Sequence, residues 1–96
     1  MDRDDVIRIL QQHKSHLAHA FGVTGLALFG SAARDTLRSN SDIDILVTFD
    51  GPATSKRYFG VQFYLEDLLG RPVDLVTEKA LRSELRPYIE TEAIRV

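Results

Sequence analysis

Short apolar runs alternate with longer amphipathic stretches along this chain, and this alternation constrains the fold more than any other feature. The apolar runs lie at residues 26–29, 43–49 and 73–77, and their lengths and β-branched content are typical of strands. Helical spacing of apolar residues marks the stretches at 6–21 and 56–69. We therefore predict an α/β fold, in which a small mixed sheet of three to four strands is covered by helices.

Local signals mark the ends of the two long predicted helices. Asp2 can cap the first helix, and Gly22 is a natural terminator for it. Gly70 is predicted to end the second helix, and Pro72, two residues later, forbids its continuation. A further short helix can start just after Gly30, and residues 36–41 are polar and are predicted to form a loop.

The C-terminal quarter is predicted to hold one short helix and an edge strand. Leu81, Leu85 and Tyr88 share a helical stripe, which we expect Pro87 to break. Residues 94–96 are predicted to form the edge strand. All the tyrosines of the chain are expected to pack against the rest of the domain: Tyr58, Tyr64 and Tyr88.

Length, composition and charge indicate one small globular domain spanning residues 1–96. The net charge of -2 lacks the basic excess of proteins that wrap nucleic acid, so we expect no direct nucleic-acid binding. The absence of cysteine excludes disulfides and thiolate zinc sites. No apolar run is long enough to span a membrane and no signal peptide is recognisable, so a cytoplasmic location without membrane contact is expected.

Two aspartates stand where the second predicted strand begins. Side chains two residues apart on a strand point to the same face, so Asp42 and Asp44 are predicted to lie side by side while Ile43 faces the core. Two unpaired carboxylates repel each other, and a divalent cation relieves the repulsion. Magnesium is typically held by one or two carboxylates together with substrate phosphates. The pair therefore indicates a site for a magnesium–phosphate complex.

Gly30 and Ser31 lie between a predicted strand and the start of a predicted helix. Free N–H groups at such a position attract anions, and glycine lets phosphate oxygens approach the backbone closely. The Ser31 hydroxyl can donate to one of those oxygens. An anion site beside a cation site is what a metal-bound nucleoside triphosphate requires, although a glycine–serine pair alone is more often an ordinary capped turn.

Asp74 is the single acid of the third predicted strand. If this strand lies beside the second one, Asp74 joins Asp42 and Asp44, where it can bind a second metal ion and accept the proton of an attacking hydroxyl. The alternative is a strand-edge carboxylate without a role in chemistry. For Arg34, a phosphate contact and a structural salt bridge are equally compatible with the sequence.

Three histidines, His13, His16 and His19, recur at every third position of the first predicted helix. Metal sites on a helix usually take a further ligand from elsewhere in the chain, and no candidate stands out. We therefore expect these histidines to be surface or boundary residues.

The two candidate motifs together resemble a known signature. Gly30-Ser31, followed after ten residues by Asp42-Ile43-Asp44, resembles the G-S-x10-D-x-D pattern of the polymerase-β-like nucleotidyltransferase superfamily. Residues 29–34 and 41–47 are similar to its stand-alone minimal nucleotidyltransferase (MNT) group, and Asp74 matches the third carboxylate of that fold. The resemblance covers nearly the whole chain, and it implies the polymerase-β-like nucleotidyltransferase fold.

The same resemblance implies a site for ATP and two Mg²⁺ ions. Its residues would be Gly30, Ser31 and Arg34 around the nucleotide, and Asp42, Asp44 and Asp74 as metal ligands. Asp74 would also be the general base. One departure is visible: many members of the family carry glycine after the arginine, whereas this chain has Asp35, which adds a negative charge near the predicted phosphate site.

Many members of the minimal group look like MntA-type antitoxins, which pair with a helical HEPN-family RNase toxin, HepT. They transfer AMP from ATP to a tyrosine of that toxin. The resemblance thus implies a protein adenylyltransferase that acts as an antitoxin in a hetero-oligomer with a HEPN-type toxin. Two alternatives stay open: a stoichiometric antitoxin without chemistry, and a subunit of a small-molecule, aminoglycoside-type nucleotidyltransferase.

Overall fold

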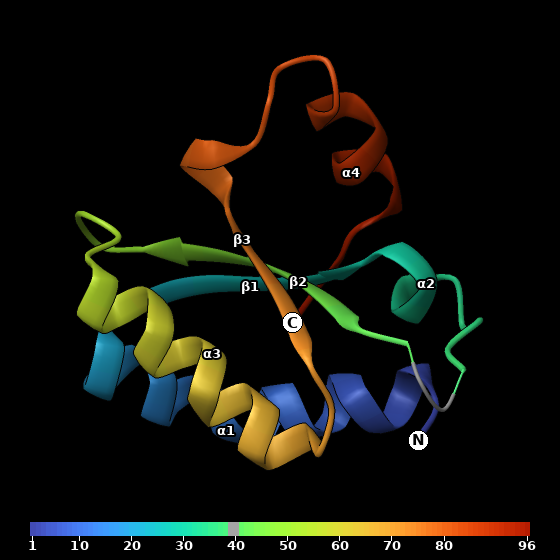
Figure 1. Cartoon of the computed structure of the whole chain (residues 1–96), viewed down its shortest axis with the longest axis horizontal. Helices are drawn as coiled ribbons and strands as arrows, with labels where there is room; N and C mark the ends of the chain where they lie inside the picture. The colour runs from blue at the N-terminus through green and yellow to red at the C-terminus, as the bar shows by residue number, and fades with distance from the viewer. Residues whose placement is uncertain (39–40) are drawn as a thin grey trace.

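The computed structural model describes residues 1–38 and 41–96, and it confirms the α/β class. One mixed sheet has the strand order β3-β2-β1-β4 (Figure 1). Its strands are β1 (Val23–Phe29), β2 (Ile43–Phe49), β3 (Val73–Thr77) and β4 (Ile94–Arg95). β1 is antiparallel to both of its neighbours, whereas β2 and β3 are parallel. A parallel pair needs a long crossover, and the helix between these two strands supplies it.

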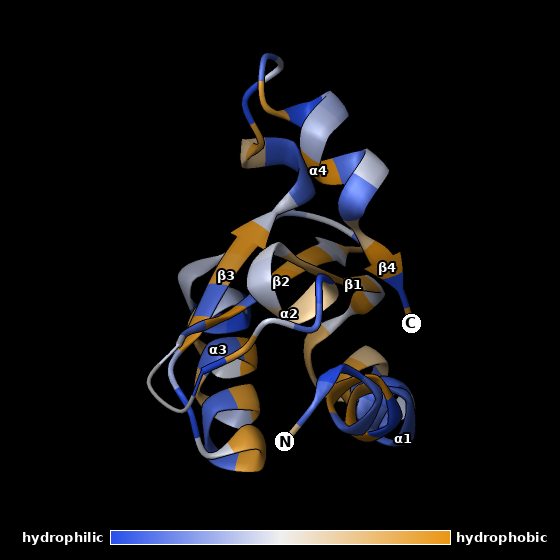
Figure 2. Ribbon diagram, turned by 90° about the vertical axis from the view of Figure 1, so that its right-hand side faces the viewer, coloured by the Kyte–Doolittle hydropathy of each residue, from blue (hydrophilic) through white to orange (hydrophobic). Residues whose placement is uncertain are grey.

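Two long helices lie side by side against one face of the sheet, and a short C-terminal helix lies over the other face (Figure 1, Figure 2). The long helices are α1 (Arg3–Phe21) and α3 (Ser55–Leu69). The short ones are α2 (Gly30–Ala33), the 3₁₀ helix η1 (Glu78–Ala80) and α4 (Arg86–Glu92). α2 directly continues β1, and α4 lies over the sheet on the side opposite to α1 and α3 (Figure 2).

The predicted ends of the long helices are confirmed. Asp2 and Asp5 form a reciprocal capping box at the start of α1, and Gly22 ends this helix in the left-handed conformation with φ +74°. Thr54 caps α3 through the N–H of Arg57. Gly70 ends α3 with φ +67°, so glycine is favoured at both termini because it enters this region without steric cost.

The larger core lies between the sheet and the pair α1 and α3. Its largest fully buried side chains come from both helices and from β1 and β2, and are Val6, Leu10, Leu17, Leu26, Leu28, Ile43, Ile45, Val47, Val61 and Leu65. The two helices approach closely at Gly60, where an added Cβ would lie 2.9 Å from Cδ1 of Phe21. A smaller cluster on the other face joins Ala27 and Leu46 to Leu81 and Ile89.

The C-terminal quarter differs from the prediction. Pro87 does not break a helix; it lies in the first turn of α4, where its missing N–H has no partner to lose. The prediction that Tyr88 packs was wrong, since this side chain is 75% exposed, and Leu85 is half-exposed as well. Ile89 packs on the sheet instead. The predicted edge strand is confirmed, over two of its three residues, as β4.

The other two tyrosines pack as predicted. Tyr58 donates its hydroxyl to the carbonyl of Leu75 at 2.6 Å. The Tyr64 hydroxyl lies 2.6 Å from Nδ1 of His13, and His16 stacks on the same ring, so both histidines are boundary residues of the α1–α3 contact.

Two further expectations concern loops and membranes. Of the predicted loop at 36–41, residues 36–38 and 41 carry no regular structure, whereas 39 and 40 lie outside the described residues. No helix in the described part of the chain combines the length and the apolar character that crossing a membrane requires.

Candidate active site

Parallel pairing of β2 with β3 brings two of the predicted carboxylates together. The register sets Asp44 opposite Asp74, so both project from the same face of the sheet. Ile43 and Ile45, on either side of Asp44, are completely buried in the larger core, which leaves the aspartates on the opposite face. The third predicted strand thus lies beside the second, which is the condition for Asp74 to join the other carboxylates. Asp42 immediately precedes β2 and is exposed.

Asp44 is the electrostatic centre of this group. The pKa of Asp44 is raised to about 6, first of all by burial, next by the charge and the hydrogen bond of Asp74, and then by the charge of Asp42. Arg34 has a smaller, opposing effect on the same pKa. Negative charge is thus concentrated where a cation would relieve it.

Gly30 makes room for the Asp44 carboxylate. Its φ is +67°, and a Cβ at this position would lie 2.9 Å from Cγ of Asp44 and collide with its Oδ2. Both the backbone conformation and the contact therefore require glycine. The neighbouring Ser31 is half-buried, and its carbonyl accepts hydrogen bonds from the N–H and the hydroxyl of Thr36. These bonds fix the turn beside the acids.

The helix that follows this turn is shorter than an anion-binding helix usually is. α2 contains four residues, so its dipole is small and anion binding would depend on the first N–H groups and the Ser31 hydroxyl.

Arg34 follows α2 and makes a salt bridge to Glu92 of α4, with Nη1 donating to Oε1 at 2.7 Å. Of the two roles that the sequence left open for Arg34, the structure shows the salt bridge. The bridge links the glycine–serine turn to α4, and nothing in the local sequence pattern could have identified Glu92, because 58 residues separate the two partners.

Asp35 has a structural explanation. It is the single non-glycine residue with positive φ in the described part of the chain, at +59°, and aspartate tolerates this conformation better than most residues. Its Oδ1 accepts a hydrogen bond from the N–H of Arg3 at 3.0 Å, which satisfies a free donor in the first turn of α1. The residue that departs from the family pattern thus ties the loop after α2 to the start of α1.

We expect Asp35→Ala to lower the free energy of unfolding by about 1–2 kcal/mol, because it removes this hydrogen bond and leaves a less tolerant residue in the left-handed region. Asp35→Gly also loses the hydrogen bond from Arg3, but glycine adopts the positive φ without strain, so this variant should be less destabilised than Asp35→Ala. Urea unfolding measures both. Equal stability of the alanine variant and the parent would contradict this role.

The residues fit a magnesium site that substrate phosphates complete. Within residues 1–38 and 41–96, no cluster of three or more His, Asp or Glu side chains is already arranged around a metal position. Asp44 and Asp74 adjoin, whereas Asp42 is exposed at the strand entrance. Two carboxylates plus phosphate oxygens match the preference of Mg²⁺, which seldom uses an all-protein cage.

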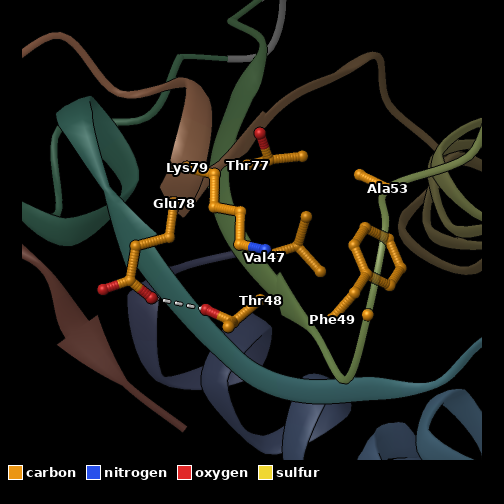
Figure 3. Close-up of a pocket in the computed structure, with 8 residues that line it drawn as sticks. Val47, Thr48, Phe49, Ala53, Thr77, Glu78 and Lys79 are labelled. Carbon is orange, nitrogen blue, oxygen red and sulfur yellow. Dashed lines mark hydrogen bonds between the residues drawn. The ribbon is translucent and has the colours of Figure 1, made fainter.

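A hollow at the far end of β2 and β3 is separate from this group. Figure 3 shows its lining, in which Thr48 donates its hydroxyl to Oε2 of Glu78 at 2.6 Å. Its volume of about 30 Å³ suits a water molecule, far below the several hundred Å³ of a nucleotide pocket. The carboxylate face remains the candidate site.

Comparison with known protein families supports the same type of site. The model of the nucleotidyltransferase domain matches residues 8–96, which is most of the chain. The chain belongs to this nucleotidyltransferase family. The expectation of a nucleotidyltransferase, drawn from the glycine–serine and aspartate motifs, is thereby confirmed.

Relatives of this nucleotidyltransferase include the protein adenylyltransferase MntA of Thermococcus cleftensis, with 36% identity over 97% of this chain and 94% of the relative. A solved structure described as a minimal nucleotidyltransferase has a TM-score of 0.84 and 34% identity, covering 100% of this chain and 97% of the other. A chain in the complex of tri-AMPylated Shewanella oneidensis HEPN toxin with MNT antitoxin shares the fold, with a TM-score of 0.61, 20% identity, and coverage of 97% and 66%. The predicted fold is therefore confirmed as that of the minimal nucleotidyltransferases.

Proposed function

We propose that this nucleotidyltransferase transfers AMP from ATP to a tyrosine hydroxyl of a HEPN-family toxin, and so acts as an antitoxin. The observation that carries the proposal is the register of Asp44 against Asp74 beside the Gly30 turn. Similarity to the adenylyltransferase MntA over almost the full length of both chains supports the reaction type. The complex of an AMPylated HEPN toxin with an MNT antitoxin, which shares this fold, supports the class of partner.

In the proposed reaction, the acceptor oxygen forms a bond to the α-phosphorus while the bond from that phosphorus to the leaving pyrophosphate breaks. The proton of the hydroxyl passes to the Asp74 carboxylate, which is exposed on the sheet face next to Asp44. The N–H groups of the Gly30 turn and the Ser31 hydroxyl would orient the triphosphate. Bound Mg²⁺, held by Asp42, Asp44 and Asp74, would neutralise phosphate charge.

Incubation of the chain with Mg²⁺, ATP labelled at the α-phosphate and a HEPN-type toxin tests the proposal. We expect label on the toxin, pyrophosphate release and loss of RNase activity. Asp74→Asn should slow labelling by about 10²–10⁴-fold, the usual contribution of a general base. As a matched control, Asp4→Asn replaces an exposed carboxylate of α1 and should leave labelling unchanged.

A second candidate is stoichiometric inhibition of the toxin without nucleotide transfer. The same incubation distinguishes the two, because a pure binder would silence the RNase without label, and Asp74→Asn would inhibit as well as the parent. That pair of results would overturn the catalytic proposal.

A further inference from the structure

The outer side of α3 carries an exposed stripe that the fold does not use. Lys56, Phe59, Phe63 and Asp67 are three or four residues apart, so they lie along one side of the helix. Phe59 is 48% and Phe63 is 61% exposed, and the two rings stack with centroids 6.1 Å apart. No described element covers this side of α3 (Figure 1, Figure 2).

The other sides of α3 are already occupied. Val61, Leu65 and Leu69 are buried in the core. Toward β3, the Gln62 and Glu66 side chains bond the backbone of Val73. Two large aromatic side chains left together in solvent are therefore not a remainder of core packing, and such a patch marks an interaction surface.

The charges at the two ends of the stripe are the reverse of what an isolated helix prefers. The positive Lys56 lies in the first turn of α3 and the negative Asp67 in the last, although the helix dipole favours acids at the N-terminus and bases at the C-terminus. Neither side chain takes part in a salt bridge within the described residues, whereas Arg57 next to Lys56 pairs with Asp50. Helix stability does not explain this arrangement.

We propose that this stripe is the contact between two copies of the chain, with their α3 helices antiparallel. A two-fold axis near residues 61 and 62 would set Lys56 of each copy opposite Asp67 of the other, and the Phe59 and Phe63 rings against their counterparts. The complement of the stripe is thus present in the chain itself, which is the condition for an isologous interface. This argument favours a second copy over an unrelated partner.

Two further features agree with a dimer of this kind. A shallow hollow of about 280 Å³, lined by Tyr64, Asp67 and Leu68, adjoins the acidic end of the stripe and can receive the aliphatic part of the opposing lysine. α3 covers the sheet face opposite to Asp44 and Asp74, so the contact leaves both candidate active sites open.

The contact is expected to be weak. One helix of 15 residues is about 22 Å long, and a single helix pair buries less than the roughly 1,600 Å² of a standard stable interface. We therefore expect a transient contact with a dissociation constant in the micromolar range, about 1–100 μM.

Sedimentation of the whole chain across this concentration range tests the proposal. We expect a reversible monomer–dimer equilibrium that Lys56→Glu, Asp67→Lys and Phe63→Ala each weaken at least about tenfold. The charge swap that combines Lys56→Glu with Asp67→Lys in one chain should restore association, and mixing the two single variants should give a heterodimer. Lys79→Glu, an exposed reversal on η1, is the matched control and should change nothing.

Circular dichroism melts of each variant separate a lost contact from a lost fold. A parent chain that remains monomeric throughout would overturn the proposal, as would a double swap that stays as weak as the single variants. If the parent is monomeric and Phe63→Ala instead abolishes binding to a HEPN toxin, the surface belongs to that partner and the self-association proposal is wrong.

Discussion

Asp44→Asn is expected to abolish nucleotidyl transfer and, at neutral pH, to stabilise the ligand-free fold. Loss of the central carboxylate removes a proposed metal ligand, for which we expect a decrease in the rate constant of at least about 10²–10³-fold. The same change removes a negative charge that is destabilised by burial and by repulsion from Asp74 and Asp42, the effects that raise the pKa of Asp44 to about 6. Activity and stability should therefore move in opposite directions.

The stability effect has a defined pH dependence. Because the pKa of Asp44 is higher in the folded chain, about 6, than its usual value of 3.8, the folded state binds the proton more tightly. The parent chain thus loses stability as pH rises from about 4 to about 6, whereas the asparagine variant lacks this loss. Asp44 is only partly buried, so solvent screens its charge. We therefore expect the asparagine variant to be more stable than the parent by about 1 kcal/mol above pH 6, which corresponds to about 4–8 °C in Tm.

Thermal melts of both proteins without Mg²⁺, from pH 4 to pH 8, measure this difference. It should be near zero at pH 4, grow through the window and then stay constant. Asp4→Asn, at an exposed position on α1, should show no comparable growth. A difference in Tm that is the same at pH 4 and pH 8 would mean that the pKa of Asp44 is not raised in the folded chain.

Elements with local signals could be predicted from the sequence, and elements defined by distant contacts could not. The strands β2 and β3 and the two long helices follow from apolar periodicity and from Gly22 and Gly70, all within a few residues of each element. The prediction for α4 was wrong because a proline is compatible with either a helix break or the first turn of a helix. The choice depends on Ile89, which packs against the sheet face opposite to α1 and α3.

The candidate site also combines features that the sequence predicts with features that it does not. Its residue types and their spacing are visible in the sequence, and the helix predicted between the second and third strands supplies the long connection that parallel pairing of β2 and β3 requires. The partners that hold the surrounding loop are not visible. Asp35 bonds Arg3 and Arg34 bonds Glu92 across 32 and 58 residues, and no pattern within either segment specifies these contacts.

Gly30→Ala is expected to damage both the fold and the chemistry, since two independent requirements meet at this position. The φ of +67° strains any residue with a Cβ by about 1–2 kcal/mol. The added methyl group would also collide with the Asp44 carboxylate and push it away from Asp74. We expect transfer to fall about 10²-fold or more from displacement of this group alone, because misplacing a reacting geometry by about 1 Å has an effect of that size.

Gly70→Ala separates the two causes. Gly70 has the same φ of +67°, but no atom lies within 4 Å of the position its Cβ would take. This variant should show the backbone strain in urea unfolding and retain full transfer activity. In a chain that already carries Asp44→Ala, Gly30→Ala should cost much less than in the parent and only slightly more than Gly70→Ala, because the colliding carboxylate is gone and only the Cβ of residue 44, 3.2 Å away, remains in close contact. If Gly30→Ala costs as much in that background as in the parent, the collision is not what makes glycine necessary beside Asp44.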